Sequence, residues 1–179
     1  MKTKSRRSPS APRARRTPAS AATIDLVPAV LRINSILVPV DFSEPSTKAL
    51  DYAVSFAAQF GAKITLLYVV EPVATPDFAA FPLAMENDRV AASARKKLQS
   101  LCEARGVEAK VVDRLVVRQG RAFHEIAEAA RTLKVDLIIL STHGFTGVKH
   151  ALLGSTTERV VRHASCPVLV VRQRERQFA

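Results

Sequence analysis

The chain has 179 residues, 47% of them apolar, and its 27 Lys and Arg exceed its 16 Asp and Glu to give a formal charge of +11. This length fits one domain, and the apolar content excludes a disordered protein. Two cysteines, Cys102 and Cys166, are too few for a disulfide scaffold. No run reaches the ~18 apolar residues that a membrane-spanning helix needs, and no compact apolar run follows the basic N-terminus as in a secretion signal. We therefore expect a cytoplasmic protein with no membrane partner and with reduced thiols.

Basic residues are concentrated at the N-terminus. Residues 1–33 hold eight Lys or Arg against one acidic residue, Asp25. Residues 1–22 consist mainly of Ser, Pro, Arg and Ala, with too little apolar surface to offset the entropy of ordering. We expect a disordered basic tail at 1–32 and a second basic tail at 173–179. The first tail suits a solvated extension, weak binding of a polyanion, or an organelle transit peptide, and these alternatives stay open.

Short apolar runs and helical periodicity alternate from Ile33 onward. Runs of β-branched and aliphatic residues predict strands, and apolar residues spaced three and four apart predict helices. In chain order we expect a strand at 35–40, a helix at 50–60, a strand at 63–70, a loop at 71–84, a helix at 87–105, a strand at 110–117, a helix at 123–130, a strand at 136–140, a helix at 155–163 and a strand at 167–171. The strands lack polar alternation, which is typical of a sheet covered on both faces. Five strands separated by helices predict a doubly wound parallel α/β fold.

Ligands of such open sheets bind beyond the carboxyl ends of the strands, where the strand order reverses. This rule points to four segments, 39–43, 68–71, 117–120 and 140–157. The last segment is rich in Gly, Thr and His, and its glycines let the backbone approach a ligand without a Cβ in the way. We therefore expect a binding site at this edge of the sheet.

The predicted helix after Gly154 opens with three hydroxyl residues, Ser155, Thr156 and Thr157. Unpaired amides and the positive end of the dipole at a helix N-terminus favour an anion, so this position suits a phosphate group. A competing interpretation is a capping box, in which Ser155 and Glu158 satisfy the helix end by themselves. Local chemistry leaves both interpretations open.

Several segments, matching in the right order, resemble the universal stress protein family. They are Ile-Leu-Val-Pro-Val-Asp-Phe-Ser at 36–43, Val-Asp-Leu-Ile-Ile-Leu-Ser-Thr-His-Gly at 135–144, Gly154-Ser155 after a nine-residue spacer, and Ser-Cys-Pro-Val-Leu-Val-Val-Arg at 165–172. The resemblance implies a universal stress protein domain at 33–172. It also implies a five-stranded parallel sheet of order 3-2-1-4-5, Rossmann-like and similar to the adenine nucleotide alpha hydrolases.

One branch of that family binds ATP through a motif of Gly, two residues, Gly, nine residues, and Gly followed by Ser or Thr. The last two glycines correspond here to Gly144 and Gly154, whereas Ser141 stands at the first position. The Ser141 side chain would either crowd the ribose or donate a hydrogen bond to it. By position, the resemblance implies a nucleotide site with Val40 and Asp41 beside the adenosine, Val69 against the adenine, Ser141, His143 and Gly144 along the ribose and phosphates, and Gly154, Ser155, Thr156 and Thr157 on the phosphates. A divalent cation, Mg²⁺ or Mn²⁺, would lie opposite Asp41.

The resemblance implies a stress-response protein that binds ATP as a regulatory or sensing ligand. We assign no catalytic residue and expect slow hydrolysis at most, because the chain lacks a P-loop lysine. The last strand, Val168–Val171, would lie at the sheet edge and pair two copies into a homodimer. One alternative is a dimeric stress-response interaction protein that binds no nucleotide. Another is a nucleic-acid-associated protein that acts through the basic N-terminal tail.

Overall fold

The computed structural model describes residues 32–72, 83–142 and 153–172, and within 83–88 it describes the backbone alone. The chain divides into two units, Met1–Val30 and Leu31–Ala179, and all described residues belong to the second. The predicted tails therefore lie outside the described residues, apart from Arg32. None of the helices in the described part of the chain is both long and apolar enough to cross a membrane.

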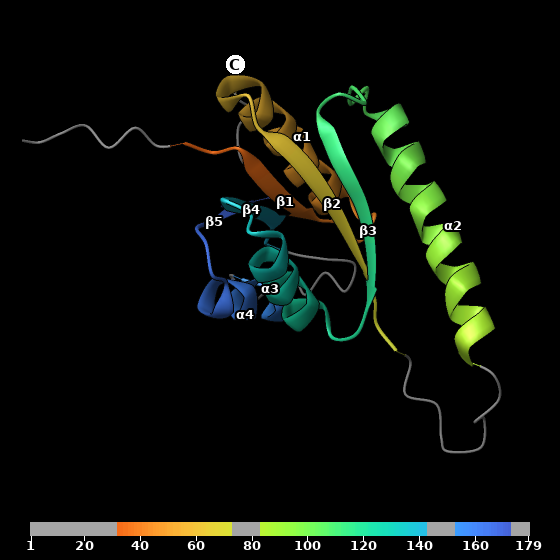
Figure 1. Ribbon diagram of the computed structural model, residues 1–179. Helices are drawn as coiled ribbons and strands as arrows, with labels where there is room; N and C mark the ends of the chain where they lie inside the picture. Colours follow the sequence, from red (N-terminus) through yellow and green to blue (C-terminus); the bar gives the residue numbers. More distant parts are fainter. Residues whose placement is uncertain (1–31, 73–82, 143–152, 173–179) are drawn as a thin grey trace, which may run out of the picture. The chain divides into compact units, whose positions relative to one another are not determined.

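Five strands and four helices alternate along the described chain (Figure 1). The elements are β1 (Ser35–Pro39), α1 (Glu44–Phe60), β2 (Lys63–Val70), α2 (Leu83–Ala104), β3 (Val112–Gln119), α3 (Ala122–Leu133), β4 (Leu137–Ser141), α4 (Ser155–His163) and β5 (Val168–Val171). The strands form one parallel sheet of order β3-β2-β1-β4-β5. The expected fold class and strand order are thus confirmed.

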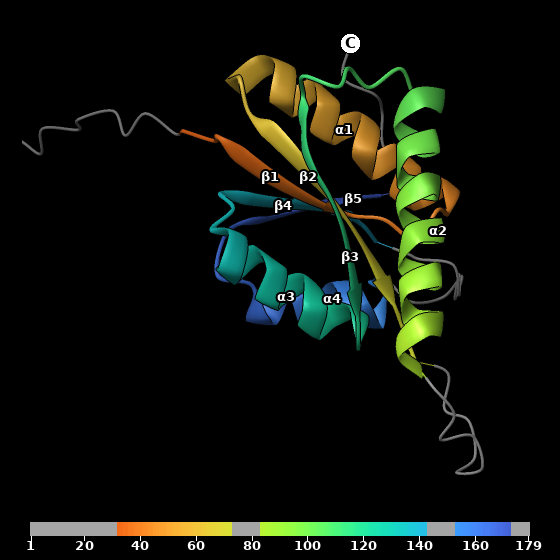
Figure 2. The same cartoon turned by 45° about the vertical axis from the view of Figure 1, so that its right-hand side comes forward.

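Helices cover both faces of the sheet. Figure 2 shows the sheet between the pair α1 and α2 and the pair α3 and α4. Alternate residues of β1 supply the two apolar cores: Ile36 and Val38 pack with Leu50 and Leu98 on the α1 and α2 side, whereas Leu37 belongs to the core on the α3 and α4 side. All three β1 residues are fully buried, which explains why this strand shows no polar alternation.

The largest boundary error is the start of α1, which begins at Glu44 and not near residue 50. The Ser43 hydroxyl accepts the backbone N–H of Ser46 at 3.3 Å and so caps the helix. Pro45 lies in the first turn, where its missing N–H costs no helical bond. The helix ends as expected at Gly61, whose φ of 70° is in the left-handed region that glycine adopts without strain.

The third and fourth strands begin two residues and one residue later than predicted. Residues 110 and 111 belong to a turn, in which the N–H of Val111 donates to the carbonyl of Glu108 at 2.9 Å. Asp136 precedes β4 because its carboxylate accepts the backbone N–H groups of Asn34 and Ser35, at 2.8 and 3.0 Å. Lys110 therefore belongs to a turn, and Asp136 binds the backbone at the start of β1. A search for apolar runs does not detect either role.

Candidate functional site

A cavity of about 640 Å³ opens beyond the carboxyl ends of β1, β2 and β4, and we call it the strand-end cavity. It includes the boundary between β1 and β4, where the order of the strands reverses, the usual ligand position in open α/β sheets. Its size is within the range of small-molecule sites. It is lined by Pro39, Val40, Asp41, Phe42, Ser46, Leu67, Tyr68, Val69, Glu71, Lys97, Ala122, Ile126, Leu140, Ser141, Gly154, Ser155, Thr156 and Thr157.

Most of the residues expected at the site line this one cavity. They are Val40, Asp41, Val69, Ser141, Gly154, Ser155, Thr156 and Thr157. The two other expected residues, His143 and Gly144, lie outside the described residues. The loop ends that supply this lining follow three different strands, and only the parallel sheet brings them together.

The loop between β1 and α1 is held by its own side chains. Oδ1 of Asp41 accepts from the backbone N–H of Ser43 at 3.0 Å and from its hydroxyl at 2.5 Å. The backbone N–H of Asp41 donates to the Ser46 hydroxyl at 3.3 Å. Between them, Phe42 has a φ of 65°, and its ring packs on Tyr68 with the centroids 4.9 Å apart. These contacts fix an aromatic wall at the cavity and explain how an unfavourable φ is maintained there.

The start of α4 is tied to the end of β4. The Thr157 hydroxyl donates to the backbone carbonyl of Ser141 at 2.8 Å, and the N–H of Gly154 donates to the carbonyl of Thr142 at 2.8 Å. Thr157 is 5% exposed and Ser141 8%, so both bonds lie in the protein interior. Because the Thr157 hydroxyl has only one proton, Thr157 offers a ligand its backbone N–H.

The capping-box interpretation of this helix start is wrong. The N-cap is Gly154, which has no side chain, and Ser155 is already helical. The Glu158 carboxylate accepts from Nη2 and Nε of Arg162, at 2.9 and 3.2 Å. No side chain in the described structure caps α4. Its first residues line the cavity, so the positive end of the helix dipole lies at the cavity.

Three lining side chains carry charge at neutral pH. Two are acidic, Asp41 and Glu71, and one is basic, Lys97. Oε1 of Glu71 accepts the backbone N–H of Ala122 at 2.7 Å and so caps α3, whose N-cap Arg121 makes no capping bond through its side chain. Lys97 comes from the middle of α2, and no motif in the sequence marks it because only tertiary packing brings α2 to this edge.

A divalent cation at Asp41 would have few protein ligands. Among the described residues, no group of three or more His, Cys, Asp or Glu could hold a metal ion. Asp41 and Glu71 both accept backbone N–H groups. These residues fit a Mg²⁺ ion that takes most of its ligands from phosphate oxygens and water, which is how proteins commonly bind Mg²⁺ with a nucleotide.

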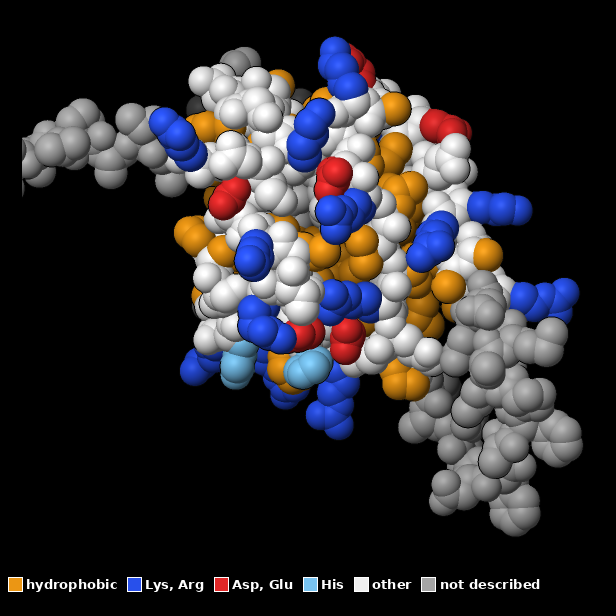
Figure 3. Space-filling view, in the orientation of Figure 1, with side chains coloured by type: hydrophobic (Ala, Val, Ile, Leu, Met, Phe, Trp, Pro, Cys, Tyr) orange, Lys and Arg blue, Asp and Glu red, His pale blue; other side chains and the backbone are white. Residues whose placement is uncertain are grey.

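Basic side chains of the domain do not mark one nucleic-acid interface on the face that Figure 3 shows. Lys and Arg are spread over that face, and several have an acidic neighbour. The ion pairs Arg131–Glu128 and Arg162–Glu158, at 2.6 and 2.9 Å, are examples on α3 and α4. Most of the excess positive charge of the chain lies instead in residues 1–33.

The fold and the strand-end cavity define a doubly wound α/β protein with a cavity at the switch point of its sheet. The model of the universal stress protein family matches residues 32–172, and the chain belongs to that family. Universal stress protein MJ0531 of Methanocaldococcus jannaschii is 35% identical over an alignment of 146 residues, and the match covers 79% of this chain and 84% of that protein.

Two solved structures share the architecture. Universal stress protein UspA from Lactobacillus plantarum is 33% identical, with a TM-score of 0.69 over 79% of this chain and 99% of that one. The protein MJ0577 of Methanocaldococcus jannaschii aligns with a TM-score of 0.70 and 28% identity over 82% of this chain and 100% of its own. Each match covers nearly the whole chain of the solved structure, so the similarity extends over that protein's entire fold.

Proposed function

We propose that this universal stress protein binds ATP in the strand-end cavity, as a regulatory or sensing ligand in the cytoplasmic stress response. The observation that carries the proposal is the start of α4, where amides without a side-chain cap open onto a cavity at the switch point of the sheet. Slow hydrolysis at most is expected, since the expected site residues provide positioning and the chain has no P-loop lysine.

Each part of the cavity suits one part of a nucleotide. Val69 is an aliphatic residue at a strand end and would pack on the flat adenine ring, with the backbone of Val40 beside the adenosine. The amides of Ser155, Thr156 and Thr157 would donate to the phosphates, with Mg²⁺ or Mn²⁺ between the phosphates and Asp41. His143 and Gly144 remain predictions for the ribose and phosphate side.

Calorimetric titration of the full chain with ATP and Mg²⁺ tests the proposal, with Gly154→Val as the disrupting variant. Gly154 has φ −64° and ψ 148°, which valine also adopts, so the variant keeps its backbone and adds bulk at the cavity. Ala164→Val is a matched control, because Ala164 lies at the other end of α4 with φ −64° and ψ 143°. We expect binding by the wild type and the control, and loss of binding in Gly154→Val.

A wild type that gives no heat at millimolar ATP would overturn the proposal. The alternative is then an interaction protein that binds no nucleotide, with the same fold and family. Equal binding by Gly154→Val and the wild type would also contradict the proposal, because the bulk would lie where the phosphates are expected.

The same chain is proposed to form a homodimer through β5. The carbonyls of Pro167 and Val171 accept the backbone N–H groups of Ile138 and Thr142. Because alternate residues of a strand direct their backbone groups to the same side, those of Leu169 also face β4. The backbone groups of Val168 and Val170 therefore point to the outer edge of the sheet, where β5 pairs with no other described strand. Such an edge can pair with the same edge of a second copy.

A further inference from the structure

We propose that Lys97 is a specificity-determining residue that contacts the phosphates of the bound nucleotide. This inference rests on the proposed function and adds to it a residue from α2, an element that contributes no strand-end loop.

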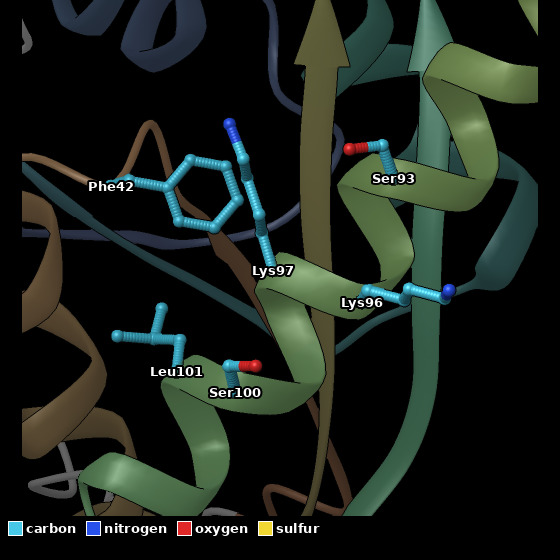
Figure 4. Close-up of a pocket in the computed structure, with 6 residues that line it drawn as sticks. All are labelled: Phe42, Ser93, Lys96, Lys97, Ser100 and Leu101. Atoms are coloured by element: carbon cyan, nitrogen blue, oxygen red, sulfur yellow. The ribbon is translucent and has the colours of Figure 1, made fainter.

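Lys97 stands where two hollows of the surface meet. It lines the strand-end cavity, and it also lines an adjoining hollow of about 540 Å³ on α2. Phe42 also lines both the strand-end cavity and the adjoining hollow. Figure 4 shows the Lys97 side chain running beside the Phe42 ring, whereas the neighbouring Lys96 points to the other side of α2. Lys97 thus reaches the cavity across the aromatic wall, and Lys96 does not line it.

The ammonium group of Lys97 has no ion-pair partner among the described residues. Among the basic side chains further along the chain, Arg105 is paired with Asp51 and Lys110 with Glu108. Lys97 therefore keeps its charge available for a ligand. A lysine acts on phosphate as a flexible point charge, so a fixed geometry in the unliganded protein is not required.

The charge of the cavity requires such a group. The described lining contains two carboxylates, Asp41 and Glu71, and Lys97 is the one cationic side chain in it. The α4 dipole contributes about half a positive charge, which offsets only a small part of the negative charge on a polyphosphate. Without Lys97 the described part of the lining would carry two carboxylates and no cationic side chain, so the residue should favour ligands with more phosphates over ligands with fewer.

The test compares ATP, ADP, AMP and adenosine on the full-length wild type and three variants: Lys97→Met, Lys97→Arg and Lys96→Met. We expect Lys97→Met to weaken ATP binding about five- to tenfold and to reduce its dependence on salt, with progressively smaller effects for ADP and AMP and none for adenosine. Lys97→Arg should retain affinity because it keeps the charge. Lys96→Met should stay within about twofold, since it removes the same charge one residue away.

Each outcome decides the proposal. If Lys97→Met binds ATP as tightly as Lys96→Met does, Lys97 makes no phosphate contact and the inference fails while ATP binding stands. If adenosine loses as much affinity as ATP, Lys97 acts on the nucleoside or on the pocket shape, and the inference fails as well. If the wild type binds none of the four ligands, the proposed function and this inference fail together.

Discussion

The hydroxyl of Thr157 and the carbonyl of Ser141 form a 2.8 Å hydrogen bond that joins the first turn of α4 to the last residue of β4. Both residues belong to the proposed ATP site, so this bond contributes to folding and to the shape of the site at once. Loss of a buried bond of this kind lowers the free energy of unfolding measurably, because the carbonyl loses the Thr157 donor.

Thr157→Val is expected to lower the free energy of unfolding by about 1–3 kcal/mol. Valine has the same shape as threonine and lacks the donor, so the Ser141 carbonyl remains buried without its partner. Thr157→Ser keeps the hydroxyl and is the control. Urea unfolding of both variants measures the difference, and equal stability of the Val and Ser variants would show that the bond contributes nothing.

Glu71 combines a structural role with an electrostatic one, and two substitutions separate them. Glu71→Ala removes the cap of α3 at Ala122 and should cost about 1 kcal/mol of stability. Glu71→Gln keeps an acceptor oxygen and removes the charge, so stability should remain near that of the wild type. ATP affinity of the Gln variant should rise about two- to fivefold, since one negative charge is removed from the cavity lining. Unfolding and calorimetry measure the two effects, and a Gln variant as unstable as the Ala variant would contradict the capping role.

Val170→Pro should convert the proposed homodimer into a monomer. Proline removes an N–H that points to the outer edge, and it leaves the bonds of Pro167 and Val171 with β4 in place. Val170→Ala keeps the N–H and serves as the control. Light scattering after gel filtration gives the mass of each form. A monomeric wild type, or a dimeric proline variant, would show that β5 is not the interface.

The two cysteines should react slowly with alkylating reagents. Burial raises the pKa of the Cys102 thiol, and burial together with the nearby Asp136 raises the pKa of Cys166. A raised pKa leaves less of the reactive thiolate at pH 8 than an exposed cysteine has, and reaction should accelerate as the pH rises further. Mass spectrometry after iodoacetamide treatment, with urea-unfolded protein as the reference, measures the ratio. Equal rates in the folded and unfolded protein would contradict protection by the fold.

The resemblance to the universal stress protein family implied the strand order, and the structure confirms that order. The predicted start of α4 at Ser155 is confirmed, whereas the competing capping-box interpretation is wrong: Ser155 and Glu158 match the capping-box pattern in sequence, but the N-cap is one residue earlier, at Gly154. A pattern of residue types cannot assign that register without backbone angles. The start of α1 was missed for a similar reason, since the Ser43 cap lies within a segment that also reads as a turn.

The cavity lining shows the same division. Residues at strand ends, such as Asp41 and Val69, could be anticipated because the carboxyl ends of parallel strands meet at one edge. Lys97 could not, because it lies in mid-helix and its neighbours in sequence have no relation to the site. Its position depends on how α2 packs on β3 and β2, which local sequence does not encode.

Gly154 has a backbone conformation that nearly every amino acid can adopt. Its replacement would therefore be tolerated by the folding of the domain even where it abolishes ligand capture. Substitution at this position could produce a homologue that keeps the fold and does not bind the ligand. Under the proposed function, ligand binding and folding therefore place separate demands on position 154.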